Sequence, residues 1–198
     1  MMISCHSWKI ILTRQLGQMD TVEGAKGGKV LLTIHFTNFQ FMLAFLRDAN
    51  TSQSVIDIFN GLEQMLSYEM FLTLFPVILT DNGSEFSNPL AIEFNNLGQQ
   101  RTHVFYCDPS APYQKGAVEN NHEFIRRIIP KGKSFDAYTQ DDINLMLSHI
   151  NSYGRKKLNN QSPTLVFSFL HKDDILKKLG IGIIQPNDII LTPQLLKK

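Results

Sequence analysis

A short stretch, residues 77–86, constrains this chain more than any other. It begins with the apolar run Val77–Leu79 and ends in a polar turn that contains Asn82 and Gly83. Such an apolar run is typical of a buried strand, and Asn-Gly is a strong turn signal. Asp81 stands where the strand meets the turn, and open α/β sheets bind ligands at the carboxyl ends of their strands. Because Asp also favours turns for local reasons, this residue alone leaves a structural and a functional interpretation equally open.

Elsewhere in the chain, apolar residues recur with two different periods that indicate strands and helices. Residues 30–37 and 41–46 are rich in strand-forming residues and are joined by a short link, which predicts an antiparallel hairpin. The same reasoning predicts a strand at 102–106 and helices at 55–66, 89–97, 115–129, 143–150 and 164–170. A helix that joins two strands of one sheet is a crossover connection. The element order therefore predicts an α/β fold with a mixed sheet and helices packed on it.

The two ends of the chain are harder to interpret. Residues Trp8–Leu12 are compatible with either a strand or a helix. The tail from Lys172 alternates charged and apolar residues and contains prolines, which predicts a small β-like or extended appendage. Inside the chain the signals are clearer, because Thr139 and Asp142 have the spacing of a capping box at the start of a helix.

Composition excludes several classes of protein. The 198 residues, 43% of them hydrophobic, suffice for one domain with a core. A formal net charge of +1 excludes a histone-like basic protein but leaves room for a local basic groove. Cys5 and Cys107 form neither a disulfide framework nor a metal-binding spacing, which fits a reducing cytoplasm. The longest apolar runs are too short to span a bilayer, so we expect no membrane partner.

Three carboxylates stand at informative positions. Asp20 precedes the hairpin in what should be the first strand, Asp81 ends a strand, and Glu119 lies in a helix. Mg²⁺ takes oxygen ligands and usually keeps waters for substrate phosphates. Two such ions about 3.5–4 Å apart can hold the attacking and leaving oxygens of a phosphoryl transfer. These three residues are therefore candidate metal ligands.

Several segments, taken in order, carry a resemblance to a known family. They are Met19–Gly24, Leu79–Phe86, Asp108-Pro109 with Gln114–Asn120, Arg126–Gly132, and Asn151–Leu158 with Ser162-Pro163. Together they resemble the catalytic core of bacterial insertion-sequence transposases of the IS-thirty family, within the DDE transposases and retroviral-type integrases. The resemblance runs from about residue 19 to 170. It divides the chain into an atypical, truncated N-terminus (1–18), an integrase-like core (19–170) and a small C-terminal appendage (171–198).

The resemblance implies a ribonuclease-H-like fold with a mixed five-stranded sheet flanked by helices. It also implies a catalytic, metal-binding triad of Asp20, Asp81 and Glu119, with two Mg²⁺ or Mn²⁺ ions as cofactor. The implied substrate is double-stranded DNA, both element ends and target, and the implied reaction is phosphodiester hydrolysis followed by strand transfer. A homodimer is expected because two DNA ends must be brought together. Family members usually carry a helix-turn-helix region before the core. The alternative is therefore an inactive remnant that only binds DNA or a sister protein, and a cellular nuclease of the same fold is a third option.

Other polar residues near the motifs admit two interpretations. Glu123 lies one helical turn after Glu119 and is a rival ligand, although the family register favours Glu119. Glu85 is expected to be a solvated turn residue and His122 a surface histidine. His35 and His103 are expected to have no functional role.

A group of cations flanks the helix that carries Glu119, and such a group can neutralise DNA phosphates. Its members are Lys115, Arg126, Arg127, Lys131 and Lys133. The segment Arg155–Lys157 is a weaker candidate, because the carboxyl end of a helix attracts cations in any case. Tyr113 could stack on a base or simply pack against the protein.

Overall fold

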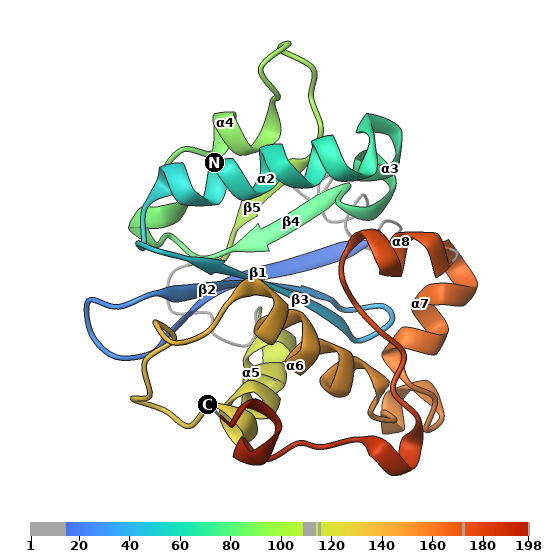
Figure 1. Ribbon diagram of the computed structural model, residues 1–198. Coiled ribbons are helices and arrows are strands. Elements are labelled where there is room, and N and C mark those ends of the chain that lie inside the picture. The colour runs from blue at the N-terminus through green and yellow to red at the C-terminus, as the bar shows by residue number, and fades with distance from the viewer. Residues whose placement is uncertain (1–14, 109–113, 115, 172, 198) are drawn as a thin grey trace.

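The computed structural model describes residues 15–108, 114, 116–171 and 173–197, and its centre is a mixed sheet (Figure 1). In the described chain the sheet has five strands in the spatial order β3-β2-β1-β4-β5. Their bounds are β1 (Leu16–Glu23), β2 (Val30–Phe36), β3 (Phe41–Arg47), β4 (Val77–Thr80) and β5 (His103–Tyr106). The first three strands pair antiparallel, whereas β4 is parallel to both β1 and β5. The predicted fold class and hairpin are confirmed.

Helices cover both faces of the sheet (Figure 1). One layer holds α2 (Ser52–Leu66), α3 (Tyr68–Leu74) and α4 (Pro89–Glu93), and the other holds α5 (Gly116–Ile128) and α6 (Gln140–Ser152). Toward the carboxyl end follow α7 (Pro163–His171) and α8 (Asp173–Lys178). Short 3-10 turns complete the chain: η1 (Ser84–Phe86), η3 (Lys156–Leu158), η4 (Pro186–Asp188) and η5 (Pro193–Leu196).

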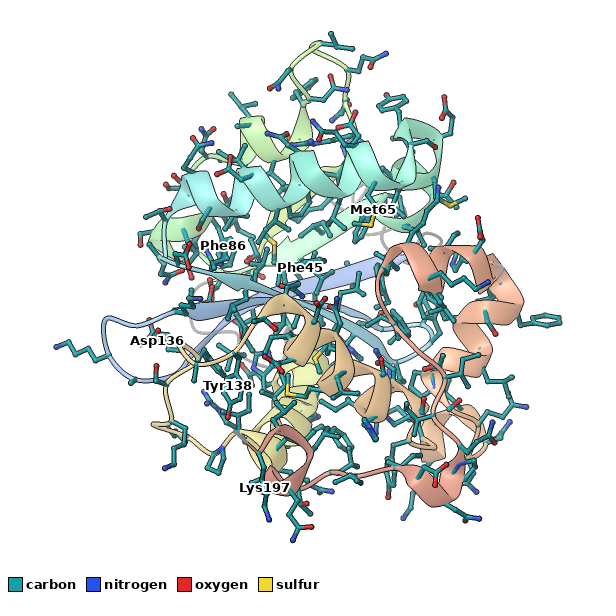
Figure 2. The ribbon with its side chains drawn as sticks, in the orientation of Figure 1. Phe45, Met65, Phe86, Asp136, Tyr138 and Lys197 are labelled. Carbon is teal, nitrogen blue, oxygen red and sulfur yellow. The ribbon has the colours of Figure 1, made fainter. Side chains whose placement is uncertain are left out.

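The core lies on both sides of the sheet. Every residue of β2 is buried, as expected for a strand that helices cover on both faces. Phe86, in η1, lies between α2 and the sheet (Figure 2). On the other side the stacked rings of Phe41 and Phe167, 4.3 Å between centroids, attach α7 to β3. No helix of the described chain is both long and apolar enough to cross a membrane.

Local capping signals in the sequence are confirmed. The Thr51 side chain accepts a hydrogen bond from the backbone N–H of Ser54 and starts α2. Thr139 and Asp142 form the expected capping box, in which each side chain accepts a hydrogen bond from the backbone N–H of the other residue. These contacts satisfy N–H groups that the first turn of a helix leaves without partners.

Three segments differ from the prediction. The phenylalanine-rich connection before β4 is helical: α3 starts at the cap Ser67 and buries Phe71 against Phe59 and Phe75. The helix expected at 89–97 ends at Glu93, because a backbone bridge between Phe94 and Gln100 takes over.

The first part of the tail is helical, so the expectation of a β-like or extended segment was wrong for α8, whereas the described chain after it is largely extended with two short 3-10 turns. Ile175 and Leu176 of α8 and Leu179 directly after it are buried, a spacing that places them on one helix face. After two further turns the chain ends beside α5, where Leu196 is buried and Lys197 follows it (Figure 2).

Side-chain amides of α6 cover the outer edge of β3. Asn151 accepts a hydrogen bond from the backbone N–H of Met42 (2.9 Å) and donates one to the carbonyl of the same residue (2.8 Å). Gln140 accepts from the N–H of Leu46 (2.8 Å) and donates to the carbonyl of Ala44 (2.9 Å). An edge strand otherwise presents unpaired backbone groups to other chains, so these two amides protect the edge and fix α6 on the sheet.

Candidate active site

The register of two parallel strands brings two aspartates together. Gln18 of β1 lies opposite Leu79 of β4. Two residues further along each chain stand Asp20, within β1, and Asp81, directly after β4. Neighbouring strands are about 4.8 Å apart and side chains alternate between faces, so both aspartates belong to one edge and one face of the sheet. The expectation that Asp20 lies in the first strand is confirmed.

Asp20 faces a histidine of α5. Its Oδ2 lies 3.9 Å from Nδ1 of His122, and Nε2 of that ring lies 2.8 Å from Oγ1 of Thr33. The Thr33 hydroxyl donates to the carbonyl of Asp20 (3.0 Å), so it accepts from Nε2, which therefore carries a hydrogen. His122 is half-buried between the helix and the sheet, and the expectation of a surface histidine was wrong.

A second carboxylate lies beside Asp81. Oδ1 of Asp81 accepts a hydrogen bond from the N–H of Gly83 (3.1 Å). A Cβ at Gly83 would lie 3.2 Å from this oxygen and 2.5 Å from Oε2 of Glu85, so a larger residue at this position would push the Glu85 carboxylate away from its place beside Asp81. Glu85 is only 8% exposed, which corrects its interpretation as a solvated turn residue. Burial lowers the pKa of Arg47, and the negative charge of Glu85 partly offsets that shift.

A glutamine of β1 fixes the start of α5. Oε1 of Gln18 accepts from the backbone N–H of Val118 (2.9 Å), and its Nε2 donates to the carbonyl of Gln114 (2.7 Å). The side chain therefore caps the first turn of α5 from a neighbouring strand. Glu119 follows Val118 directly, so the backbone of Glu119 is held beside Gln18. Gln18 stands two positions before Asp20 in β1.

The third candidate ligand is placed differently from the aspartates. The Glu119 side chain is exposed, and so is that of its rival Glu123. Within the described residues no group of three or more His, Cys, Asp and Glu side chains lies close enough to hold a metal ion. The structure brings Asp20 and Asp81 to one edge and does not gather Glu119 with them. The donor chemistry of the aspartate pair fits a hard cation, which binds carboxylate oxygens and retains waters.

The predicted DNA-binding cations fall into two groups. Nη2 of Arg126 donates to the carbonyl of Glu23 (2.7 Å), and burial lowers the pKa of this arginine. That guanidinium therefore fixes α5 to the end of β1. Lys115, like Tyr113, lies outside the described residues. The other candidates are all exposed, at the end of α5 and in the following loop: Arg127, Lys131 and Lys133.

Comparisons with known proteins agree with this arrangement. No family model matches the chain. The chain is 35% identical over 65 residues to a transposase of insertion sequence IS1086 from Cupriavidus metallidurans, a match that covers 33% of this chain and 19% of the relative. It is 26% identical over 155 residues to the transposase InsI of IS30A from Escherichia coli, which covers 76% of this chain and 37% of the relative. A putative integrase of a Spiroplasma virus is 26% identical over 142 residues, 72% of this chain and 42% of that protein.

The fold has solved counterparts. The catalytic core domain of BIV integrase superposes with a TM-score of 0.56 at 21% identity and covers 81% of this chain and 98% of that domain. The chain is thus similar in sequence to IS30-type transposases and shares its fold with an integrase catalytic core. A simian T-cell lymphotropic virus intasome structure matches the chain with a TM-score of 0.56 at 15% identity, over 87% of this chain and 59% of that one. The matches span about a fifth to two-fifths of the length of these curated relatives.

Proposed function

We propose that the chain is the catalytic core of a DNA transposase, which hydrolyses a DNA phosphodiester and then transfers the freed strand to a target. One observation carries the proposal: the parallel register of β1 and β4 sets Asp20 beside Asp81 at the carboxyl edge of the sheet. The similarity to transposases of insertion sequences supports it. As further parts of the proposal we include double-stranded DNA as partner, a homodimer that joins two ends, and a cytoplasmic location.

Asp20, Asp81 and Glu119 would hold a pair of Mg²⁺ or Mn²⁺ ions. When bound, such ions supply the charge that activates water and stabilises the leaving oxygen. Asp20 and Asp81 offer oxygens from rigid backbone positions. Glu119 is exposed at the first turn of α5, so its side chain is free to change rotamer toward the aspartates. Catalysis of this kind rests mainly on positioning and electrostatics, which fits a site of carboxylates.

The exposed cations would hold the DNA backbone near these carboxylates. Arg127, Lys131 and Lys133 have exposed side chains, whereas the guanidinium of Arg126 already donates to a carbonyl. Cations of this kind bind phosphates without regard to sequence and displace counterions from DNA. We therefore expect these three residues to set the strength and the salt dependence of DNA binding.

The test is a nicking and strand-transfer assay with Mg²⁺ or Mn²⁺. We expect metal-dependent cleavage by the wild type and its loss in Asp81→Asn, with at least about a hundredfold drop in rate when a charge-stabilising group is removed. Glu119→Gln and Glu123→Gln form a matched pair on one helix, since both side chains are exposed. Loss in the first variant with retention in the second would assign the third ligand to Glu119, and the reverse would assign it to Glu123.

Calorimetry separates the metal-binding step from the chemistry. Binding of Mg²⁺ or Mn²⁺ to the wild type should weaken in Asp20→Ala. Equal cleavage by the wild type and Asp81→Asn would refute the catalytic proposal. DNA binding without metal-dependent cleavage would instead favour a protein that only binds DNA, and efficient cutting without preference for any DNA end would favour a nuclease.

A further inference from the structure

A basic pocket lies on the side of α5 that faces away from the candidate active site. Its volume is about 200 Å³, and it is formed by α5, the hairpin turn at Gln40 and the segment after α6. The residues that define its chemistry are Asn120, Asn121, Phe124, Arg155, Lys156 and Lys157. Three of these carry positive charge, and among the residues that the structure describes no carboxylate lines the pocket.

Arg155 is a buried cation with few partners. It is 8% exposed, its Nη2 donates to the carbonyl of Ile150 (3.0 Å), and its Nε and Nη1 have no hydrogen-bond partner within the described part of the chain. The guanidinium carbon lies 3.8 Å from the ring centre of Phe124. Burial lowers the pKa of Arg155 to about 10, so the group still carries its charge at neutral pH.

A second buried arginine has a hydrogen-bond partner for each nitrogen of its guanidinium group. Arg101 is completely buried, and its Nη1 lies 2.9 Å from a carboxylate oxygen of Glu63 and 2.8 Å from the amide oxygen of Asn60. Its Nε and Nη2 donate to backbone carbonyls. A buried charge is costly unless it is paired, so the contrast indicates that Arg155 lacks an anionic partner that a ligand would supply.

The positive charges of the pocket also act on a neighbouring histidine. His35 lies behind it and accepts a hydrogen bond from Nδ2 of Asn121 (3.2 Å). The pKa of His35 is lowered to about 3, chiefly by burial and further by the positive charges of Arg155, His122 and Lys157. The side chains of Lys156 and Lys157 are exposed, so they can move to meet a ligand.

We propose that this pocket binds a phosphodiester group of DNA, at a phosphate other than the one that reacts. The proposal rests on the proposed function, since it assigns a second contact for the same substrate. A free phosphate would satisfy the same cations. DNA is favoured because the exposed Asn120 of the pocket directly follows Glu119 on α5, so one strand that crosses the helix can reach both sides.

The test compares two double variants that remove the same charge. Lys156→Gln/Lys157→Gln alters the pocket, and Lys177→Gln/Lys178→Gln removes an exposed lysine pair from α8 as the matched control. Affinity for a short duplex of arbitrary sequence is measured by fluorescence anisotropy across salt concentrations, with EDTA present so that no cleavage occurs. Loss of one phosphate contact makes the slope of log K against log salt shallower by about 0.9. Between about 50 and 200 mM salt the affinity of the variant should therefore fall by roughly 3.5-fold less than that of the wild type.

A reduced slope for the pocket variant alone supports the proposal. Equal slopes for both variants, whether reduced or not, overturn it, as does a wild type that fails to bind the duplex. A second arm follows the Nε–H signal of Arg155 by NMR during titration with inorganic phosphate. The duplex is then added to the phosphate-bound protein. If it reverses the change in chemical shift that phosphate caused, the two ligands share a site; if the chemical shift stays unchanged, the assignment to DNA is overturned. Because no metal is present, failure of catalysis in the separate nicking assay leaves this result untouched.

Discussion

The amide of Gln18 offers the most direct way to separate stability from site assembly. This side chain spans from β1 to the start of α5, where it accepts from Val118 and donates to Gln114. Gln18→Met keeps nearly the same length and removes both hydrogen bonds. We expect it to loosen the first turn of α5, and with it the placement of Glu119, while the sheet that carries Asp20 stays intact.

The expected cost follows from the groups left without partners. Each lost hydrogen bond is worth about 0.5–1.5 kcal/mol, and a buried donor left unsatisfied costs about 1–3 kcal/mol. The N–H of Val118 is such a donor, because that residue is fully buried in the first helical turn. The free energy of unfolding should therefore fall by about 2–4 kcal/mol, which lowers the melting temperature by roughly 4–16 °C in a chain of this size.

Gln140→Met is the matched control. Gln140 also makes one accepting and one donating hydrogen bond to backbone groups, but at the outer edge of β3. Urea denaturation should show similar losses of stability for both variants. Metal affinity by calorimetry, measured well below the melting temperature, should weaken in Gln18→Met and stay unchanged in Gln140→Met. Equal metal affinities in the two variants would refute the claim that Gln18 positions Glu119.

Three further perturbations test polar contacts elsewhere in the fold. Arg101→Met should lower the free energy of unfolding by about 3–5 kcal/mol in urea denaturation, because it leaves the carboxylate of Glu63 without its cationic partner; a neutral result would contradict the pairing. Asn151→Leu removes both hydrogen bonds between the Asn151 side chain and the backbone of Met42 at the sheet edge. It should cause self-association, visible by light scattering; a monodisperse variant with unchanged stability would argue against edge protection. The folded-state pKa of His35 is about 3, below the ordinary 6.5, so the unfolded chain binds the proton first and stability falls as pH drops from 6.5 toward 3. His35→Gln should flatten this dependence of the urea midpoint by about one proton, and an unchanged slope would show that other groups dominate.

The sequence predicted the parts of the site that depend on local patterns. Asp81 follows an apolar run that is typical of a buried strand, and Asp20 was expected in the first strand because it precedes the hairpin. The capping box at Thr139 was also visible, because both partners lie within four residues. Each of these features is specified by neighbours in the chain, so periodicity and turn chemistry suffice to find them.

Contacts between distant segments were not predictable in the same way. Gln18 and Val118 are separated by 100 positions, and nothing in either segment indicates the hydrogen bond. Glu85 stands in a polar turn, yet η1 turns it inward beside Asp81, where the absence of a Cβ at Gly83 leaves space. For His122, the sequence indicated only that this residue lies on the helix that carries Glu119. The face it occupies depends on how α5 lies on the sheet, which is a tertiary property.

Helix α5 separates two kinds of charge that nearly cancel in the whole chain. One side carries His122, which faces Asp20, while the other borders the pocket of Arg155 and Lys157. The formal net charge of +1 therefore says little about attraction to DNA, because a polyanion responds to the local field. A strand held by the basic side would bring its phosphates toward the acidic side, where only a divalent cation can offset the repulsion between phosphate and carboxylate. On this reasoning the pocket adds to the metal-independent DNA binding that Arg127, Lys131 and Lys133 provide, and metal binding should tighten DNA binding only while both aspartates are present.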